Sequence, residues 1–166
     1  MEFNNFIFLD KQKLDAFLPE LYAILHSNMA SIAPTGNSYE EDFQVWYSNV
    51  MPAMQKDPRQ IVLMYAGNSL AGYFQYYINA ASNSLMMEEI QIKEQYHGSG
   101  LFSEFYKWLV KRLPEDVLSV EAYAHKTNSK SQGILGHLGL TCQGESNNGN
   151  MFYYKGKYAD LLQKYI

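Results

Sequence analysis

Two glycines stand at the start of a strongly periodic helical segment. Residues 98–100 read Gly-Ser-Gly, and apolar side chains then recur at helical spacing from Leu101 to Leu109. Glycine lowers the stability of a helix, so the pair is expected where the backbone has a special task. The unbonded N–H groups and positive dipole end of a helix N-terminus suit a phosphate, whose approach larger side chains would block. The sequence predicts an anion-binding loop; the alternative is a tight strand-to-helix turn without a ligand.

The spacing differs from that of the two common nucleotide-binding motifs. A P-loop continues with Lys and then Ser or Thr after its last glycine, but Leu101 and Phe102 stand there. A dinucleotide fingerprint has a third glycine and an early βαβ position, and this segment has neither. These two motifs are therefore excluded as explanations of the loop.

Two adjacent carboxylates interrupt the apolar strand segment LMMEEIQI, residues 85–92. Strand alternation places Glu88 and Glu89 on opposite faces. Strand interiors disfavour carboxylates, so at least one is expected to enter a cleft, where it could accept a proton. The alternative is that one is a solvated strand residue and the other an ion-pair partner.

The elements that position these residues alternate along the chain. Strands are predicted at residues 6–9, 60–66, 70–78, 84–92, 117–124, 140–144 and 150–155. Helices are predicted over about 10–29, from 38 to Pro52, after Gly98, and over 128–138. Ser38 and Glu41 form a capping box, and Pro52 is expected to end or kink its helix. The order β-α-α-β-β-β-α-β-α-β-β predicts a single α/β domain over residues 1–166, with a mixed, mostly antiparallel sheet.

Composition narrows the classes of protein. An apolar fraction of 47% and a charged fraction of 18% are typical of a globular protein. A net charge of −4 without a basic stripe argues against nucleic acid as a partner. No segment has the length of a membrane span, the histidines lack metal-ligand spacing, and the single cysteine suits the cytoplasm. Cys142 is expected to be a buried small hydrophobe.

A second block follows the next predicted strand. Asn128 is predicted to cap a helical segment that ends in Leu-Gly-Leu at residues 138–140. Together with residues 92–102, this block resembles the GNAT superfamily of N-acetyltransferases, in which a glycine-rich loop opens the central helix and an Asn follows the next strand. The order of elements from residue 6 to about 155 is also similar to that family.

The resemblance implies an acetyl-CoA-dependent N-acetyltransferase that moves an acetyl group directly to a primary amine of a small molecule or peptide. It implies Glu88, with Glu89 second, as the base near the amine, and a strand N–H near Ile90 as the donor to the oxyanion. The partners implied are acetyl-CoA and the amine, bound by a monomer or homodimer. Cofactor contacts fall on Ile90, Gln91, Ile92, His97, Gly98, Ser99, Gly100, Leu101, Phe102, Asn128 and Ser131.

Three positions depart from the family pattern. His97 stands where Arg or Gln is usual, and Phe102 where a small residue is usual. Leu135 occupies the position of a tyrosine that is proposed to protonate the leaving CoA thiolate. Tyr123 or Tyr153 could replace that acid. The alternative prediction is a non-catalytic acyl-CoA-binding sensor or interaction module.

Overall fold

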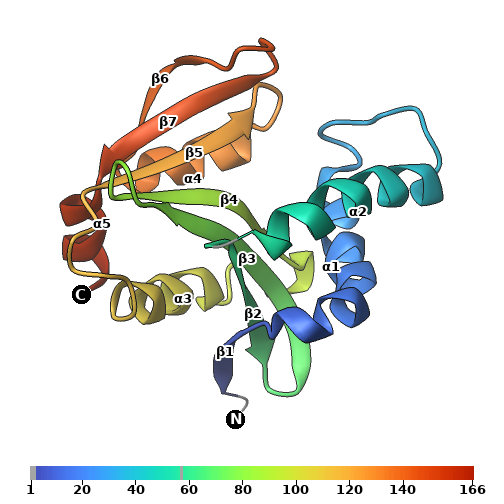
Figure 1. Ribbon diagram of the computed structural model, residues 1–166, viewed down its shortest axis with the longest axis horizontal. Helices are drawn as coiled ribbons and strands as arrows, with labels where there is room; N and C mark the ends of the chain where they lie inside the picture. The colour runs from blue at the N-terminus through green and yellow to red at the C-terminus, as the bar shows by residue number, and fades with distance from the viewer. Residues whose placement is uncertain (1–2, 57) are drawn as a thin grey trace. The chain divides into compact units, whose positions relative to one another are not determined.

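The computed structural model describes residues 3–56 and 58–166, and its elements follow the predicted order (Figure 1). The strands are β1 Asn4–Phe8, β2 Gln60–Ala66, β3 Ser69–Asn79, β4 Ser84–Ile92, β5 Ser119–His125, β6 Thr141–Glu145 and β7 Met151–Lys157. The α-helices are α1 Leu14–Met29, α2 Tyr39–Gln55, α3 Leu101–Val110, α4 Ser129–His137 and α5 Tyr158–Tyr165. Two 3-10 turns, η1 Lys11–Lys13 and η2 Glu94–Tyr96, precede α1 and α3.

The strands form one mixed sheet in the order β1-β2-β3-β4-β5-β7-β6. β1 and β2 are antiparallel, β4 and β5 are parallel, and β7 pairs antiparallel with both β5 and β6. A parallel pair needs a crossover, and α3 supplies it between β4 and β5. The predicted α/β class, with its strand–helix–strand crossover, is confirmed.

The chain gathers into two compact units. The first comprises residues 1–75 and 89–101, and the second comprises residues 76–88 and 102–166, as far as each is described. The cut falls within β3 and β4, so each of these strands contributes residues to both units.

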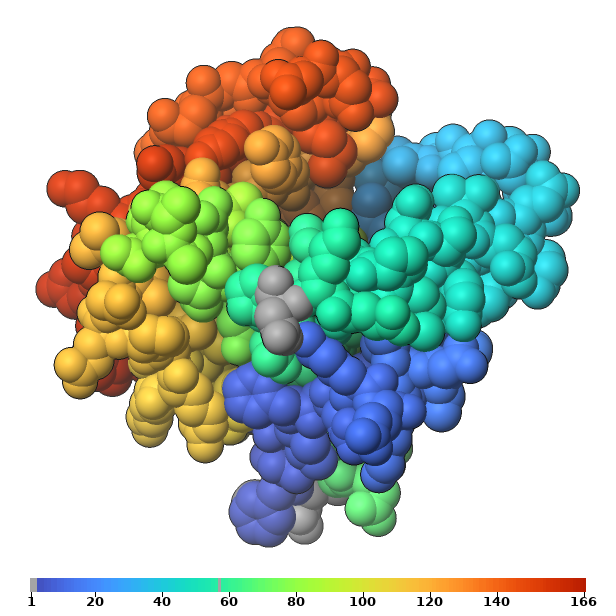
Figure 2. Space-filling model, viewed as in Figure 1, coloured from blue at the N-terminus to red at the C-terminus, as the bar shows by residue number. Residues whose placement is uncertain are grey.

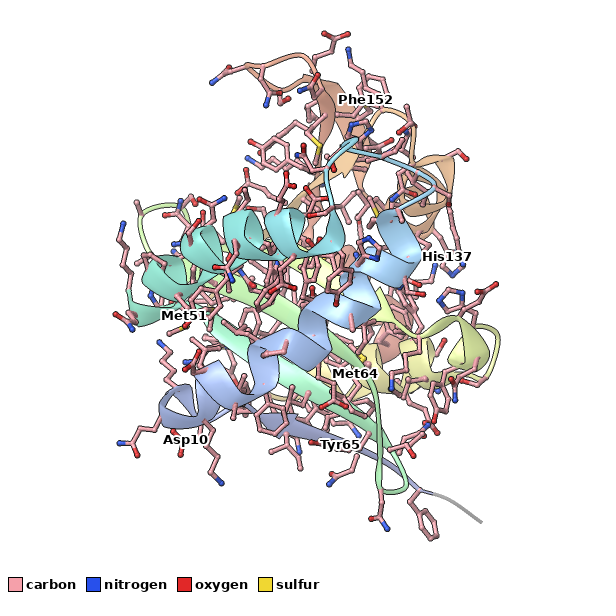
Figure 3. All side chains as sticks on the ribbon, turned by 90° about the vertical axis from the view of Figure 1, so that its right-hand side faces the viewer. Asp10, Met51, Met64, Tyr65, His137 and Phe152 are labelled. Carbon is pink, nitrogen blue, oxygen red and sulfur yellow. The ribbon has the colours of Figure 1, made fainter. Side chains whose placement is uncertain are left out.

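The core of the first unit lies between its strands and the helices α1 and α2, which run side by side (Figures 1 and 3). Ser38 caps α2 by accepting a hydrogen bond from the Glu41 N–H at 3.2 Å, as predicted. Pro52 does not end the helix, which continues to Gln55. The buried core residues are Leu9, Leu14, Leu18, Leu21, Ile24, Val50, Met54, Ile61, Leu63, Leu70 and Tyr73.

The second unit contains a helix that the sequence analysis missed. α5 follows β7 without a loop and buries Tyr158, Leu161 and Tyr165. These residues recur at spacings of three and four, which is the pattern of one buried helix face. Tyr165 stacks on Tyr106 of α3, with ring centroids 5.4 Å apart.

The expectation for Cys142 is wrong. Its side chain is exposed, as is every residue of β6. β6 lies at the edge of the sheet, where it pairs only with β7 and is interrupted by an irregularity between Cys142 and Gly144. Successive side chains of a strand point to opposite faces, so the exposure of every residue shows that neither face of β6 is covered.

Candidate functional site

The glycine loop has a backbone that requires glycine. Gly98 and Gly100 have φ values of +78° and +89°, in the left-handed region that other residues rarely adopt. A Cβ atom added at either position would meet nothing within 4 Å. The backbone conformation, not crowding within the protein, thus accounts for both glycines, and the space above them is open.

Hydrogen bonds within the loop hold this conformation. The N–H groups of His97 and Ser99 donate to the carbonyl oxygens of Glu94 and Tyr96, at 3.0 and 3.2 Å. The Ser99 hydroxyl also donates to the Tyr96 carbonyl, at 2.6 Å. The loop then enters α3 at Leu101, where a helix leaves its first N–H groups without intrahelical acceptors. The predicted juxtaposition of glycines and helix N-terminus is present.

The end of β4, just before this loop, is tied to α1. The Asn28 amide donates to the Ile92 carbonyl at 2.9 Å and to Gln91 Oε1 at 3.0 Å. His97 Nε2 lies 2.7 Å from the same Ile92 carbonyl, which can only accept, so this nitrogen carries the proton. Asn28 has no motif around it in the sequence, and its role was not predicted.

A second residue missed by sequence reasoning is Gly72 on β3. A Cβ atom there would lie 2.4 Å from the Gln91 carbonyl oxygen, so β3 can approach β4 only because this residue is glycine. The Lys93 N–H donates to the carbonyl oxygen of Ala71, the residue before Gly72, at 2.8 Å. A glycine inside a predicted strand was the available signal for such a close approach.

The two carboxylates of β4 differ in environment. Glu88 is exposed, whereas Glu89 is half-buried and accepts a hydrogen bond from Gln91 Nε2 at 2.5 Å. Tyr73 is fully buried, and its hydroxyl has no hydrogen-bond partner in the described part of the chain. Burial, and then the charge of Glu89, raise the pKa of Tyr73 well above its usual value, so this phenol stays protonated.

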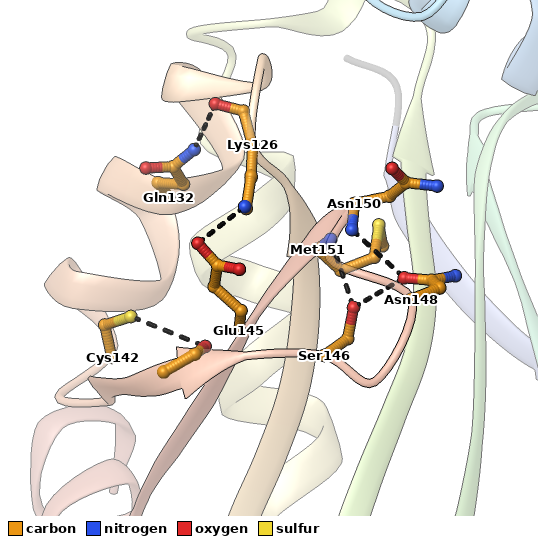
Figure 4. Close-up of polar contacts among 9 residues, drawn as sticks. Lys126, Gln132, Cys142, Glu145, Ser146, Asn148, Asn150 and Met151 are labelled. Carbon is orange, nitrogen blue, oxygen red and sulfur yellow. Dashed lines mark hydrogen bonds and ion pairs between the residues drawn. The ribbon is translucent and has the colours of Figure 1, made fainter.

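In the second unit, Asn128 caps α4. Its side chain is buried and accepts from the Ser131 N–H at 3.0 Å, so the predicted capping role is confirmed. Gln132 of α4 donates to the carbonyl oxygen of Lys126 at 3.0 Å (Figure 4) and to that of His125 at 3.2 Å, which fixes the turn between β5 and α4. Leu135 is buried in the same helix.

The two tyrosines considered as substitute acids lie side by side on β5 and β7. The rings of Tyr123 and Tyr153 meet edge to face, 5.2 Å between centroids. The Tyr153 hydroxyl donates to Glu121, whereas Tyr123 is exposed. Nearby, Lys126 pairs with Glu145 at 2.7 Å and anchors the β6–β7 hairpin (Figure 4).

The predicted site residues divide between the units. The first unit gathers Glu89, Ile90, Gln91, Ile92, His97, Gly98, Ser99, Gly100 and Leu101 in one continuous segment. Glu88, Phe102, Asn128 and Ser131 belong to the second unit. Among residues 3–56 and 58–166, no group of three or more His, Cys, Asp or Glu side chains could hold a metal ion, and no helix could cross a membrane.

Several solved structures with a similar fold are acetyltransferases. No protein-family model and no curated protein matches the sequence. The PaiA N-acetyltransferase of Thermoplasma acidophilum, solved in complex with coenzyme A, is 19% identical with a TM-score of 0.71 over 94% of this chain and 99% of its own. A GNAT-family protein from Desulfovibrio desulfuricans is 14% identical, with a TM-score of 0.70 over 93% and 99% of the two chains. A spermidine/spermine N-acetyltransferase of Vibrio cholerae is 12% identical, with a TM-score of 0.62 over 97% of each. The chain therefore has the fold of the GNAT acetyltransferases.

Proposed function

We propose that this protein is an acetyl-CoA-dependent N-acetyltransferase that acts on a primary amine. The proposal rests on the loop at Gly98 and Gly100, just before α3. Both glycines have positive φ, and no atom lies within 4 Å of where their Cβ atoms would be. A loop of this kind suits the pyrophosphate of CoA, because helix N-termini bind phosphate through backbone N–H groups. The fold shared with a CoA-bound acetyltransferase supports the same assignment.

We extend the proposal to the residues that contact the cofactor. The main chain of Ile90, Gln91 and Ile92 would pair with the pantetheine arm in the manner of an added strand. The segment His97–Phe102 would hold the pyrophosphate, mainly through backbone N–H groups. Asn128 and Ser131, at the start of α4, would contact the cofactor while the Asn128 cap stays in place. We further propose a cytoplasmic location, which the single cysteine, Cys142, favours, and a monomer or homodimer.

The chemistry is direct attack of the amine on the thioester carbonyl. The amine must lose a proton, and Glu88 is our candidate base because its exposed carboxylate can accept that proton directly or through water. A backbone N–H near Ile90 would stabilise the oxyanion. With leucine at position 135, the thiolate leaves without a phenol from that position. A free cysteine thiol has a pKa of about 8.5, and a CoA thiolate of similar stability can leave at neutral pH.

The test is turnover of acetyl-CoA, read as free thiol, across amines, amino acids, aminoglycosides and peptide N-termini. A parallel measurement of melting temperature with and without acetyl-CoA reports binding alone. Amine-dependent thiol release supports the proposal. Binding without turnover of any amine would support the non-catalytic acyl-CoA-binding role instead, and the absence of both would exclude CoA chemistry.

A further inference from the structure

A cavity of about 500 Å³ lies within the first unit, between α1, the connecting segment 30–38 and α2. Figure 2 shows α2 and this segment at the molecular surface. The volume is in the range of small-molecule sites. Its lining is mostly apolar and aromatic, with Leu25, Met29, Ala33, Pro34, Val45 and Trp46 among the residues.

The aromatic side chains that flank the cavity are fixed by one another. Tyr22 of α1 is buried, and its ring lies 5.3 Å from that of Trp46 and 5.1 Å from that of Tyr39 on α2. Val45, by contrast, lines the cavity with 60% of its surface exposed. The cavity thus combines a rigid aromatic wall with an apolar wall that is open to solvent, which suits an apolar ligand body.

The charge in the cavity is negative and comes from one residue. Asp42 is the only carboxylate among the described lining residues, and no Lys or Arg is among them. Its two oxygens accept from Thr35 Oγ1 at 2.6 Å and from Asn37 Nδ2 at 3.4 Å, so the segment 30–38 orients it. A carboxylate has about four lone-pair sites, and these two hydrogen bonds occupy two of them.

The cavity and the end of β4 share one turn of α1. His26 and Met29 line the cavity, and Asn28 between them bonds to Gln91 and Ile92 of β4. A ligand in the cavity is therefore held by the same helical turn that fixes the strand assigned to the pantetheine arm.

Given the proposed acetyl transfer, on which this step rests, we infer that the cavity binds the acceptor and that the acceptor is an amine carried on an apolar body. The apolar wall takes the body, and the aromatic rings and Asp42 attract the cation. A polycation such as spermidine fits less well, because the described lining offers one carboxylate to its several charged amines.

The first experiment measures binding without CoA, by calorimetry with the full chain. The probes are 2-phenylethylamine, its neutral analogue 2-phenylethanol, and spermidine. We expect 2-phenylethylamine to bind at least about tenfold more tightly than either of the others, since a hydrogen-bonded charge pair and apolar burial then act together. Equal or tighter binding of spermidine, or no binding of 2-phenylethylamine, would overturn the inference.

Two variants locate the site. Asp42→Asn removes the charge and should weaken the binding of 2-phenylethylamine by about tenfold while leaving the binding of 2-phenylethanol unchanged. Glu40→Gln removes the same charge from an exposed position in the same turn of α2, outside the cavity, and should leave both ligands unchanged. Ala33→Phe fills the cavity and should weaken the binding of both ligands. This variant tests the location of the site even if Asp42→Asn loosens the segment 30–38.

Turnover then separates this inference from the proposed function. With saturating acetyl-CoA, Asp42→Asn should raise the KM for 2-phenylethylamine about tenfold with little change in kcat. Turnover of other amines with no binding of 2-phenylethylamine would overturn the acceptor class and leave the acetyltransferase proposal standing. Charge-dependent binding of 2-phenylethylamine in the cavity without any turnover would have the opposite meaning. It would support the ligand class and contradict the proposed acetyltransferase activity.

Discussion

The side-chain amide of Asn28 donates to the carbonyl oxygen of Ile92, 2.9 Å away, and so links the end of α1 to the last residue of β4. The same carbonyl faces His97 Nε2, so one oxygen joins a helix, a strand and the glycine loop. This arrangement makes Asn28 a positioning residue for the glycine loop, although Asn28 lies far from that loop in the sequence.

We therefore expect Asn28→Ala to weaken both the fold and cofactor binding. The change removes two hydrogen bonds and leaves the Ile92 carbonyl with one donor, which should cost about 1–3 kcal/mol of unfolding free energy. Chemical denaturation measures this loss, and calorimetry with acetyl-CoA should show weaker binding. Gln44→Ala, on the exposed face of α2, is the control and should change neither quantity. An Asn28→Ala protein with unchanged CoA affinity would confine Asn28 to a stabilising role.

Substitution of Gly100 separates backbone strain from phosphate binding. Gly100→Ala forces a Cβ into the left-handed region and should destabilise the fold by roughly 1–2 kcal/mol. Gly100→Glu adds a similar strain together with negative charge where the pyrophosphate is proposed to dock, so it should abolish the rise in melting temperature given by acetyl-CoA.

Gly36 offers a matched control for that pair. It has φ +80° and open space around its Cβ position, but it lies in the segment between α1 and α2. Gly36→Glu should lower the melting temperature to a similar extent and keep the shift with acetyl-CoA. A folded Gly100→Glu protein with a full shift would remove the phosphate-loop assignment.

Local signals in the sequence predicted those features whose cause is local. The Gly98 and Gly100 pair, the Ser38 cap and the Asn128 cap each depend on residues within a few positions, and each has the predicted backbone role. Asn28 and Gly72 were missed because their partners, Ile92 and Gln91, are brought to them only by the folded sheet.

Two other differences between the predictions from the sequence and the structure have a similar physical origin. α5 was missed because it follows β7 directly: Lys157 provides no side-chain cap, and Gly156, which could mark a turn, lies inside the strand. Cys142 was predicted to be buried on residue type alone, but its exposure depends on β6 being an edge strand, which is a property of sheet order.

The buried hydroxyl of Tyr73 predicts a stabilising substitution. It has no hydrogen-bond partner in the described part of the chain, so it is desolvated without compensation. Tyr73→Phe should therefore raise the unfolding free energy by up to about 1 kcal/mol, or about 2–4 °C in melting temperature. Tyr106→Phe is the control: that hydroxyl is also buried but donates to the Met87 sulfur at 3.5 Å, so no gain is expected. A loss of stability in Tyr73→Phe would indicate that the hydroxyl has a bound partner, such as a water shared with Glu89.

Of the two proton transfers in the reaction, loss of a proton by the amine is expected to limit the rate more than protonation of the thiolate. An alkylammonium must lose a proton before it attacks, whereas a CoA thiolate is stable enough to leave at neutral pH without a protein acid. Glu88→Gln keeps the shape of the side chain and removes the base, so kcat/KM should fall by about 100-fold at pH 7. The deficit should shrink as pH rises, because free amine then reaches the thioester without help.

Two further variants decide between this assignment and its rivals. Glu89→Gln should have a smaller effect on kcat/KM than Glu88→Gln, since Glu89 already accepts from Gln91 and is less accessible. A larger effect would transfer the role of base to Glu89. Leu135→Tyr places a phenol at a buried position of α4 and should give little gain if thiolate departure is already easy. A large gain from Leu135→Tyr, with Glu88→Gln near the wild-type rate, would mean that protonation of the thiolate limits the reaction and that the amine needs no base from β4.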